Sequence, residues 1–336
     1  MVHTTEENTV TIVLPVYNGE AFLRQAIDSI LAQTFTDYEL WVVNDGSTDG
    51  SMAIVEGYAD SRIVRKDNPS NLGLVATLNN TFAQITTPFI ARMDADDIWH
   101  PRKLELQMAH LRQHPSVGIC GTSIHKFGDI DQTMIFPKES NALKVGLLFY
   151  CMMSHPSVVF RRESILKHNL TYNPDFFPAE DYKLWIDALK VTDIHNLQTP
   201  LVEYRQHENQ ICRKKHHKQL DLESKLREEQ LRLIYPNPTA EEIAYHLTHF
   251  VALNPQSDAE VLQMLRWKSR LCQVNRQNRF IEPTIFDREL TRYVGNAIRN
   301  YYASSWQGIR HHIATKRYKS LDTKHNLSLI LHRHGR

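Results

Sequence analysis

Cysteine is scarce in this 336-residue sequence, and the four residues are far apart with no Cys-x-x-Cys pair: Cys120, Cys151, Cys212 and Cys272. This spacing argues against a zinc ribbon and against a disulfide framework, and it favours a reducing compartment. Long apolar runs are missing as well, because no window reaches eighteen apolar residues, and the N-terminus has no basic segment followed by an apolar one. We therefore expect neither a transmembrane helix nor a signal peptide, and a cytoplasmic protein.

An excess of charge of either sign is also absent, since 39 Lys and Arg stand against 38 Asp and Glu, for a formal net charge of +1. A near-neutral chain is not typical of nucleic-acid binders, so no nucleic-acid partner is expected. The balance hides one asymmetry: residues 299–336 carry eight Lys or Arg, five His and a single acid, Asp322. With 42% hydrophobic and 23% charged residues, the chain is long enough for an α/β core and a second region.

Strand and helix patterns alternate over about the first hundred residues. Short apolar runs indicate buried strands at 10–16, 39–43, 63–65 and 88–92, and apolar residues recur at helical spacing between them. Such alternation predicts a mostly parallel sheet with right-handed crossovers, whose ligands lie beyond the carboxyl ends of the strands. Polar segments follow three of these strands, at Tyr17-Asn18, at Asp45 and at 94–97, so we expect them at one edge of the sheet.

The pattern changes after residue 115. Strand-like segments at 117–121 and 156–160 are less regularly interleaved with helices. From about 215 the chain becomes helical, with capping boxes at Thr239-x-x-Glu242 and Ser257-x-x-Glu260 and helical patterns over 217–234 and 285–303. The expected organisation is an α/β domain over 1–214 followed by an α-helical region over 215–336 that ends in the basic tail.

Three carboxylates, Asp94, Asp96 and Asp97, lie within four positions directly after an apolar run. Unpaired carboxylates this dense repel one another, which points to a hard divalent cation and so to a metal-bound phosphate. Two other interpretations stay open on these residues alone. One is a solvated turn in which Asp97 caps a helix beginning near Pro101, and the other is the proton-donating DxDD motif of class II terpene cyclases. The convergence of polar turns at one sheet edge favours the metal site.

The segment from Asp45 to Glu56 spells an EF-hand loop, with Asp, Ser, Asp, Gly and Glu at the expected positions. An EF-hand needs a helix on both sides, whereas 38–43 is rich in β-forming residues. We therefore predict a strand-end turn whose Asp45 points into a ligand crevice and whose Asp49 caps the helix that follows.

Four blocks, in this order and at these intervals, resemble family 2 of the inverting glycosyltransferases: TIVLPVYNGEAFLRQAIDSILAQTF, ELWVVNDGSTDGS, NLGLVATLNN and RMDADDIWHPRKL. They cover about the first 110 residues. The resemblance implies a bacterial enzyme of GT-A fold, that is, a Rossmann-like, mostly parallel nucleotide-sugar domain. In this chain it would have a donor half over about 8–115 and an acceptor half over about 116–214.

The resemblance assigns donor-binding roles residue by residue. Pro15 and Tyr17 match the segment that lines the nucleobase, and Asp45 matches the carboxylate that accepts a hydrogen bond from the uracil imide N–H. Where the family usually has two acids, this chain has Asn44 before Asp45. The predicted donor-binding residues are Pro15, Tyr17, Asn18, Asp45, Asn71, Gly73, Arg92, Asp94, Asp96 and His155. Arg65 is the other candidate phosphate contact. Ordinary ion pairs would also explain Arg65 and Arg92, and a structural role on an edge strand would also explain His155.

The resemblance also assigns the metal and the base. The triple-Asp segment matches the family's DXD-type metal loop, and we prefer Asp96 and Asp97 as ligands of Mn²⁺ or Mg²⁺. Glu180-Asp181 match an acidic pair at the start of a helix beside the acceptor, in which Asp181 is the general base. Simple helix N-terminal acids would be placed in the same way.

The expected reaction is transfer of a hexose or N-acetylhexosamine from a UDP-sugar to a hydroxyl of a glycan or lipid-linked oligosaccharide, with inversion and formation of a β-glycosidic bond. The expected pathway is bacterial lipooligosaccharide, O-antigen or capsule synthesis, with the basic tail contacting the cytoplasmic face of the inner membrane. Two alternatives remain. A metal-dependent nucleotidyltransferase normally has a Gly-rich, basic loop after its first strand, unlike Tyr17-Asn18-Gly19-Glu20 here, and a catalytically inactive nucleotide-sugar-binding module would keep the same motifs.

Overall fold

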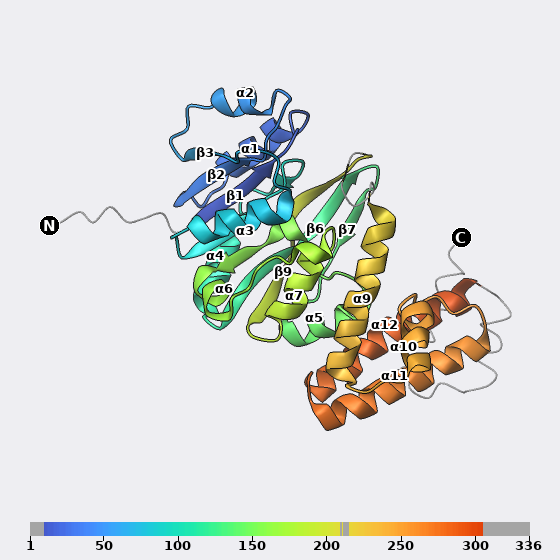
Figure 1. Ribbon diagram of the computed structural model, residues 1–336. Helices are drawn as coiled ribbons and strands as arrows, with labels where there is room; N and C mark the ends of the chain where they lie inside the picture. Colours follow the sequence, from blue (N-terminus) through green and yellow to red (C-terminus); the bar gives the residue numbers. More distant parts are fainter. Residues whose placement is uncertain (1–9, 209, 211–214, 305–336) are drawn as a thin grey trace, which may run out of the picture. The chain divides into compact units, whose positions relative to one another are not determined.

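The computed structural model describes residues 10–208, 210 and 215–304, and it divides into two compact units (Figure 1). The first unit comprises Met1–Leu143 and Tyr150–Leu226, and the second comprises Lys144–Phe149 and Arg227–Arg336. Most of the predicted basic tail lies outside the described residues, as do Cys212 and the first nine residues. The predicted domain boundary at 214/215 and the two predicted halves stay predictions.

Nine strands form one sheet in the described part of the first unit, in the order β3–β2–β1–β4–β8–β6–β9–β5, with β7 paired to β6. They are β1 Val10–Val16, β2 Tyr38–Asn44, β3 Ile63–Asp67, β4 Phe89–Arg92, β5 Ile98–Trp99, β6 Val117–Gly128, β7 Gln132–Met134, β8 Val159–Arg161 and β9 Asp193–Gln206. The four strands β1 to β4 are parallel neighbours. β8 runs antiparallel between β4 and β6, and β6 is parallel to β9.

Helices connect these strands and cover the sheet (Figure 1). They are α1 Leu23–Leu31, α2 Ser51–Glu56, α3 Leu74–Gln84, α4 Lys103–Gln113, α5 Ser140–Gly146, α6 Arg162–His168 and α7 Glu180–Ala188, with 3-10 turns η1 His155–Ser157 and η2 Pro174–Phe176. Helix α9 His216–Ile234 follows the last strand, and its residues are divided between the two units. Apolar side chains of the central strands, such as Leu14, pack with Ile27 of α1 and Leu104 and Met108 of α4 in one buried cluster. The predicted α/β class with a mostly parallel sheet is confirmed.

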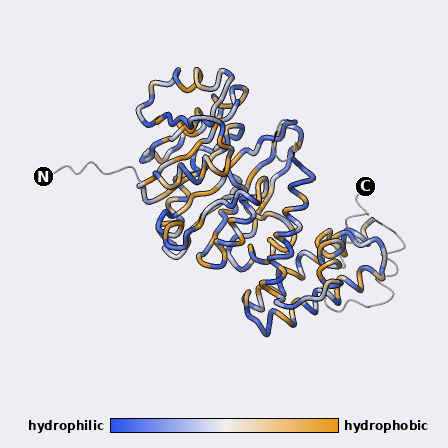
Figure 2. Tube along the Cα trace, viewed as in Figure 1, coloured by the Kyte–Doolittle hydropathy of each residue, from blue (hydrophilic) through white to orange (hydrophobic). Residues whose placement is uncertain are grey.

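The second unit is helical in its described residues. It contains α10 Ala240–Tyr245, a π-helical turn η3 His246–Phe250, α11 Asp258–Asn278 and α12 Pro283–Ser304. The predicted capping box at Thr239 is complete, whereas at Ser257 the Glu260 carboxylate accepts the amide of Gln256 instead of that of the cap residue. Figure 2 shows hydrophobic positions recurring along these helices, and no helix among the described residues is long and apolar enough to span a membrane.

Candidate active site

The turns after β1 and β2 interlock at one edge of the sheet. Asn18 has a φ of 52°, and its side-chain oxygen accepts the amide of Thr48 at 2.8 Å. Asp49 accepts the amide of Ser51, the first residue of α2, at 3.0 Å, but the N-cap of this helix is Gly50, so the prediction that Asp49 is the cap residue is wrong. The segment that precedes this turn is strand β2, so the helix–loop–helix context of an EF-hand is absent here.

Asp45 holds the loop that leads into α3. Its buried carboxylate accepts three hydrogen bonds: at Oδ1 from Asn68 Nδ2 and the Leu72 amide, both at 2.8 Å, and at Oδ2 from the Gly73 amide at 3.0 Å. A carboxylate has about four acceptor positions, so one position on Oδ2 is left for a ligand. The predicted residues Asn71 and Gly73 therefore lie beside Asp45, as their assignment requires.

Asn44 replaces the first acid of the usual pair, and its contacts explain why an amide suits this position. Its Nδ2 donates to Asp67 Oδ1 at 2.8 Å, and its Oδ1 accepts the amide of Ser47 at 2.8 Å. A carboxylate at residue 44 would face Asp67 with like charge.

Pro15 and Tyr17 lie at the end of β1, next to this turn. Pro15 is paired with Val43 in the β1–β2 register. The Tyr17 side chain is 54% exposed, and Leu72, whose amide binds Asp45, is 39% exposed. Tyr17 follows β1 and Asp45 follows the neighbouring β2, so an exposed ring that can stack on a planar base and a carboxylate that can read its edge come from adjacent strand ends.

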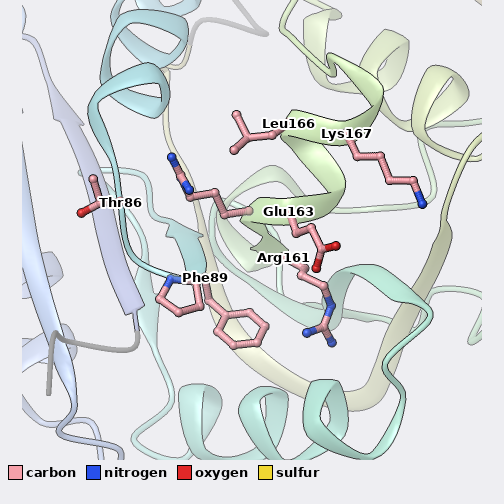
Figure 3. Close-up of a pocket in the computed structure, with 8 residues that line it drawn as sticks. Thr86, Phe89, Arg161, Glu163, Leu166 and Lys167 are labelled. Carbon is pink, nitrogen blue, oxygen red and sulfur yellow. The ribbon is translucent and has the colours of Figure 1, made fainter.

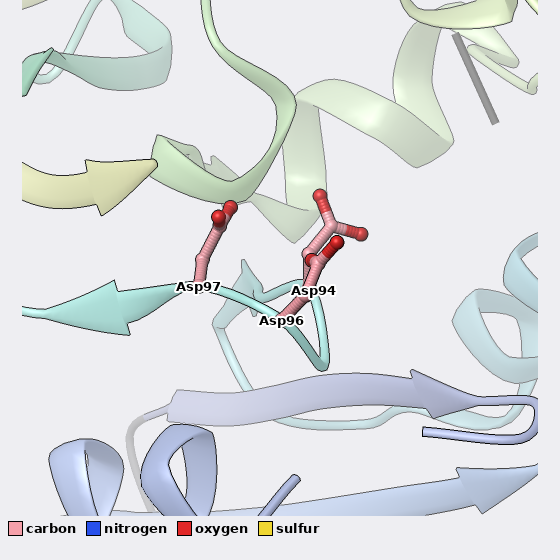
Figure 4. A group of neighbouring side chains, drawn as sticks. All are labelled: Asp94, Asp96 and Asp97. Carbon is pink, nitrogen blue, oxygen red and sulfur yellow. The ribbon is translucent and has the colours of Figure 1, made fainter. Parts of the chain in front are cut away.

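The three aspartates after β4 form a compact carboxylate cluster. One oxygen of each lies within 4.8 Å of the others, and Figure 4 shows the side chains on the same side of the loop. Asp94 forms an ion pair with Arg92, and Asp96 Oδ2 lies 3.0 Å from Nε2 of His207. Asp97 Oδ1 accepts the amide of Arg205 at 2.8 Å.

Asp97 is the most enclosed member of the cluster. It is 1% exposed, and its Oδ2 has no hydrogen-bond partner among the described residues. Burial, together with the charges of Asp96 and Asp94, raises its pKa well above the usual value. The alternative that Asp97 caps a helix is wrong, because α4 begins at Lys103 with Arg102 as its N-cap and no side-chain cap bond.

This donor set fits a divalent cation. Carboxylate oxygens are the ligands that Mg²⁺ and Mn²⁺ prefer, and an imidazole is also compatible with Mn²⁺. The enclosed, unpartnered Oδ2 of Asp97 is a group that a cation would satisfy, and His207 lies close enough to Asp96 to share the site.

The predicted phosphate-contacting arginines have different surroundings. Arg65 forms ion pairs with Glu56 and Asp67 on the surface, which is the ordinary role. Arg92 is 1% exposed and pairs with Asp94, while its Nε has no partner among the described residues. Its contact with the donor stays a prediction.

Glu180 and Asp181 begin α7, as predicted. The buried face of this helix includes Leu184 and Trp185, which fixes the acids at its start. Asp181 Oδ1 accepts the amide of Tyr182 at 2.6 Å, and Oδ2 lies 3.9 Å from the sulfur of Cys151. Glu180 is 5% exposed, and its Oε2 has no partner within the described part of the chain.

Burial raises the pKa values of these two acids above those of ordinary carboxylates. It raises the pKa of Glu180 to about 8, with a further contribution from the Asp181 charge, and it raises the pKa of Asp181 to about 6. Arg92 and Asp94 act electrostatically on both acids. The charge of Asp94, a member of the carboxylate cluster, therefore acts on both acids, which favours a common site.

His155 lies on turn η1 directly before β8. It is buried, and its Nε2 lies 2.7 Å from the hydroxyl of Tyr172. The alternative of a histidine on an edge strand is wrong, because β8 lies between β4 and β6 in the interior of the sheet.

A cavity of about 680 Å³ lies away from these residues (Figure 3). It borders Phe89 at the start of β4, whereas Asp94 follows the end of that strand. The charged side chains of Arg161 and Lys167 point in different directions in Figure 3, so they do not form a converging binding site. The carboxylate cluster, and not this cavity, is the candidate active site.

Comparison with known proteins agrees with this geometry. The family model described as glycosyl transferase family 2 matches residues 11–168. An uncharacterised glycosyltransferase of Haemophilus influenzae is 30% identical over 238 residues, which are 66% of this chain and 73% of that relative. The chain belongs to glycosyltransferase family 2.

Two further relatives of this family 2 glycosyltransferase are informative. The UDP-Glc:alpha-D-GlcNAc-diphosphoundecaprenol beta-1,3-glucosyltransferase WfgD of Escherichia coli is 30% identical over 216 residues, 62% of this chain and 82% of WfgD. The crystal structure of S. aureus TarS residues 1–349 in complex with UDP has a TM-score of 0.55 and 15% identity, and the match covers 89% of this chain and 92% of TarS. The latter likeness supports the GT-A fold.

Four residues at the site of this glycosyltransferase were not identified from the sequence: Asn68, Tyr172, Arg205 and His207. Arg205 and His207 reach the carboxylate cluster from the end of β9, more than a hundred positions along the chain. The polar residues at the end of β9 and directly after it, Tyr204-Arg205-Gln206-His207, are the signal that a strand-end argument could have used. Asn68 directly follows β3, so the same strand-end argument could have found it, whereas Tyr172 sits in a loop without such a signal.

Proposed function

We propose that this enzyme transfers a hexose or N-acetylhexosamine from a UDP-sugar to a hydroxyl of a glycan acceptor, with inversion at the anomeric carbon and formation of a β-glycosidic bond. One observation carries the proposal: a cluster of three carboxylates, in which the buried Asp97 has an oxygen with no partner among the described residues, acts electrostatically on a buried acid pair on α7. The similarity to WfgD, which is named as a UDP-Glc glucosyltransferase, supports this donor class.

The proposed choice of a UDP-sugar as donor rests on Asp45 and Tyr17. The spare acceptor position on Asp45 Oδ2 suits the imide N–H of uracil, and the exposed ring of Tyr17 suits its face. Asn18, Asn71 and Gly73 shape the surrounding turns. A cytosine edge offers an acceptor where uracil offers a donor, so this carboxylate favours UDP over CDP.

Asp96 and Asp97 would hold a divalent cation, with Asp94 turned towards Arg92 and His207 available as a further ligand. A bound Mn²⁺ or Mg²⁺ supplies positive charge that neutralises the leaving nucleoside diphosphate. Arg92 and His155 are the residues that would make further contacts to the diphosphate.

Asp181 is the proposed general base. Oδ1 is occupied by the Tyr182 amide, so Oδ2 is the oxygen that can take the proton of the acceptor hydroxyl. Near pH 7 the raised pKa values leave Asp181 mostly ionised and Glu180 mostly protonated, so the pair supplies one base and one hydrogen-bond donor. The hydroxyl oxygen attacks from the face opposite the diphosphate, which gives inversion.

The acceptor and the pathway are proposed by analogy with relatives. A glycan carried on a lipid diphosphate, as in the name of WfgD, would place the enzyme in bacterial lipooligosaccharide, O-antigen or capsule synthesis. The enzyme would then act in the cytoplasm at the inner membrane, with the basic tail in contact with anionic lipid.

A screen of donors tests this function. UDP-glucose, UDP-galactose and their N-acetylamino forms are incubated with the protein and Mn²⁺ or EDTA, and UDP release is measured. We expect one donor to be hydrolysed only with metal, because an active transferase leaks slowly to water. The variant Asp60→Asn is the control for an aspartate substitution outside the site, because Asp60 pairs with Arg62 there. UDP binding without hydrolysis of any donor would instead support the inactive binding module.

A further inference from the structure

Tyr172 is a buried tyrosine to which the proposed function assigns no role. Its side chain is 2% exposed, and its hydroxyl oxygen lies 2.7 Å from Nε2 of His155. Asn79 of α3 clamps its backbone: Asn79 Nδ2 donates to the Tyr172 carbonyl at 2.8 Å, and the Tyr172 amide donates to Asn79 Oδ1 at 3.0 Å. The Phe82 ring meets the Tyr172 ring edge-on at 5.8 Å between centroids. The hydroxyl is therefore held in one place.

The turn that carries His155 is anchored just as firmly. Trp99 Nε1 donates to the carbonyl of Pro156 at 3.0 Å, and Gln107 Nε2 donates to the carbonyl of Ser157 at 2.8 Å. The Trp185 ring meets the imidazole edge-on at 6.1 Å between centroids. The Tyr172–His155 contact is thus set by packing against helices α3, α4 and α7 and strand β5, and neither ring can move away without disturbing this packing.

Both groups are neutral at physiological pH. Burial, together with the positive charge of Arg92, lowers the pKa of His155 well below its usual value. Burial raises the pKa of Tyr172 well above its usual value. The imidazole therefore carries one proton and one lone pair, and the phenol keeps its O–H. Two arrangements of the hydrogen bond remain, and they differ in the nitrogen that carries the imidazole proton.

The surroundings of the hydroxyl select between these arrangements. If Nε2–H donated to the phenol oxygen, the buried O–H would have no acceptor among the described residues, which is costly. If the O–H donates to Nε2, both groups are satisfied and the imidazole proton is on Nδ1. That nitrogen makes no hydrogen bond within the described part of the chain and, unlike the hydroxyl of the preceding residue, Ser154, it is not sealed from solvent.

We propose that Tyr172 is a positioning residue whose hydroxyl holds His155 in the Nδ1–H tautomer, so that a neutral imidazole presents a fixed N–H to the diphosphate of the donor. An N–H that is already held in place needs little reorganisation to donate a hydrogen bond when negative charge develops on the leaving group. The identity of the anion rests on the proposed function, whereas the tautomer does not.

The tautomer can be measured without any substrate. In protein labelled with ¹⁵N-histidine, the ring-nitrogen chemical shifts identify the protonated atom, and the signals lost in His155→Gln assign the residue. We expect Nε2 to be the unprotonated nitrogen in the wild type, and Tyr172→Phe to abolish this preference. Tyr38→Phe is the matched control, because it removes another buried hydroxyl, which donates to the Ile30 carbonyl. A proton on Nε2 in the wild type, or an unchanged tautomer in Tyr172→Phe, would overturn the proposal.

Kinetics then separate positioning from a purely structural role. For hydrolysis of the UDP-sugar that the donor screen selects, Tyr172→Phe should lower kcat about tenfold and leave KM within about twofold. The double variant with His155→Ala should be no slower than His155→Ala alone, because Tyr172 acts through His155. Multiplicative losses in the double variant would overturn the positioning role. If the wild type hydrolyses no donor, the proposed function fails, and the NMR result still decides the tautomer.

Discussion

At the scale of the residue, Asp97 combines features that are costly unless a ligand compensates for them. It is enclosed, it faces Asp94 and Asp96, and one of its oxygens is unpartnered among the described residues. Its other oxygen ties the loop to Arg205 of β9. Asp97 thus has a structural oxygen and a free one, and these functions can be separated by mutation.

Asp97→Asn should separate them. The amide oxygen can still accept the Arg205 amide, whereas the charge that holds a cation is lost. We expect stimulation of UDP-sugar hydrolysis by Mn²⁺ to fall by about a hundredfold or more, with thermal unfolding in EDTA showing that the fold is intact. Titration of the rate with Mn²⁺ is the measurement, and a variant with the wild-type metal response would remove Asp97 from the metal site.

Asp181→Asn tests the base in the same manner, because asparagine retains the acceptor for the Tyr182 amide. Turnover should fall by about a hundredfold or more while the Kd for UDP is preserved. Near-normal turnover in this variant would contradict the assignment of the base.

The raised pKa of Asp181 also predicts the pH dependence. A base works only when ionised, so wild-type kcat should fall as the pH drops through about 6, the value to which burial raises this pKa. A pH profile of kcat gives the value directly. A profile that stays flat down to the range of an ordinary aspartate would show that another group accepts the proton.

At the scale of the element, the turn after β2 and the loop before α3 depend on each other. Gly46 has a φ of +76°, and a Cβ at this position would lie 2.8 Å from the Asn71 backbone nitrogen. Backbone atoms cannot give way as a flexible side chain can, so a larger residue must displace the loop that Asp45 holds.

Gly46→Ala should therefore weaken donor binding and not the chemical step. We expect the KM for the UDP-sugar to rise about tenfold, with kcat within about twofold. Gly57→Ala is the control, since Gly57 ends α2 with an ordinary φ of −74°. Equal kinetics for the two variants would show that the loop is not part of the donor site.

Local sequence patterns predicted the helices and strands well, because these elements depend mainly on residues that are close together in the sequence. The apolar run at 10–16 is β1, and the capping box at Thr239 begins α10. The two-residue strand β5 has no local pattern, since it exists only by pairing with β9. The same limit applied to the site: neighbours in sequence revealed Asp94, Asp96 and Asp97, whereas His207 reaches Asp96 only through the fold.

At the scale of the whole molecule, the charge asymmetry of the chain predicts contact with anionic lipid. Residues 305–336 contain seven Lys or Arg and one acid, and a truncation after Ser304 leaves α12 whole. Each basic residue near an anionic surface contributes about 1 kcal/mol. We expect the full chain, and not the truncated one, to float with phosphatidylglycerol vesicles, and neither to float with phosphatidylcholine. Equal flotation of both forms would remove the membrane role of the tail.

The central claim is that the carboxylate cluster binds UDP through a divalent cation. Calorimetric titration of UDP into the full chain, once with Mn²⁺ and once with EDTA, tests it most directly. We predict a single UDP site whose affinity is at least about tenfold higher with Mn²⁺. Equal affinity in EDTA, or no binding of UDP at saturating metal, would contradict the account.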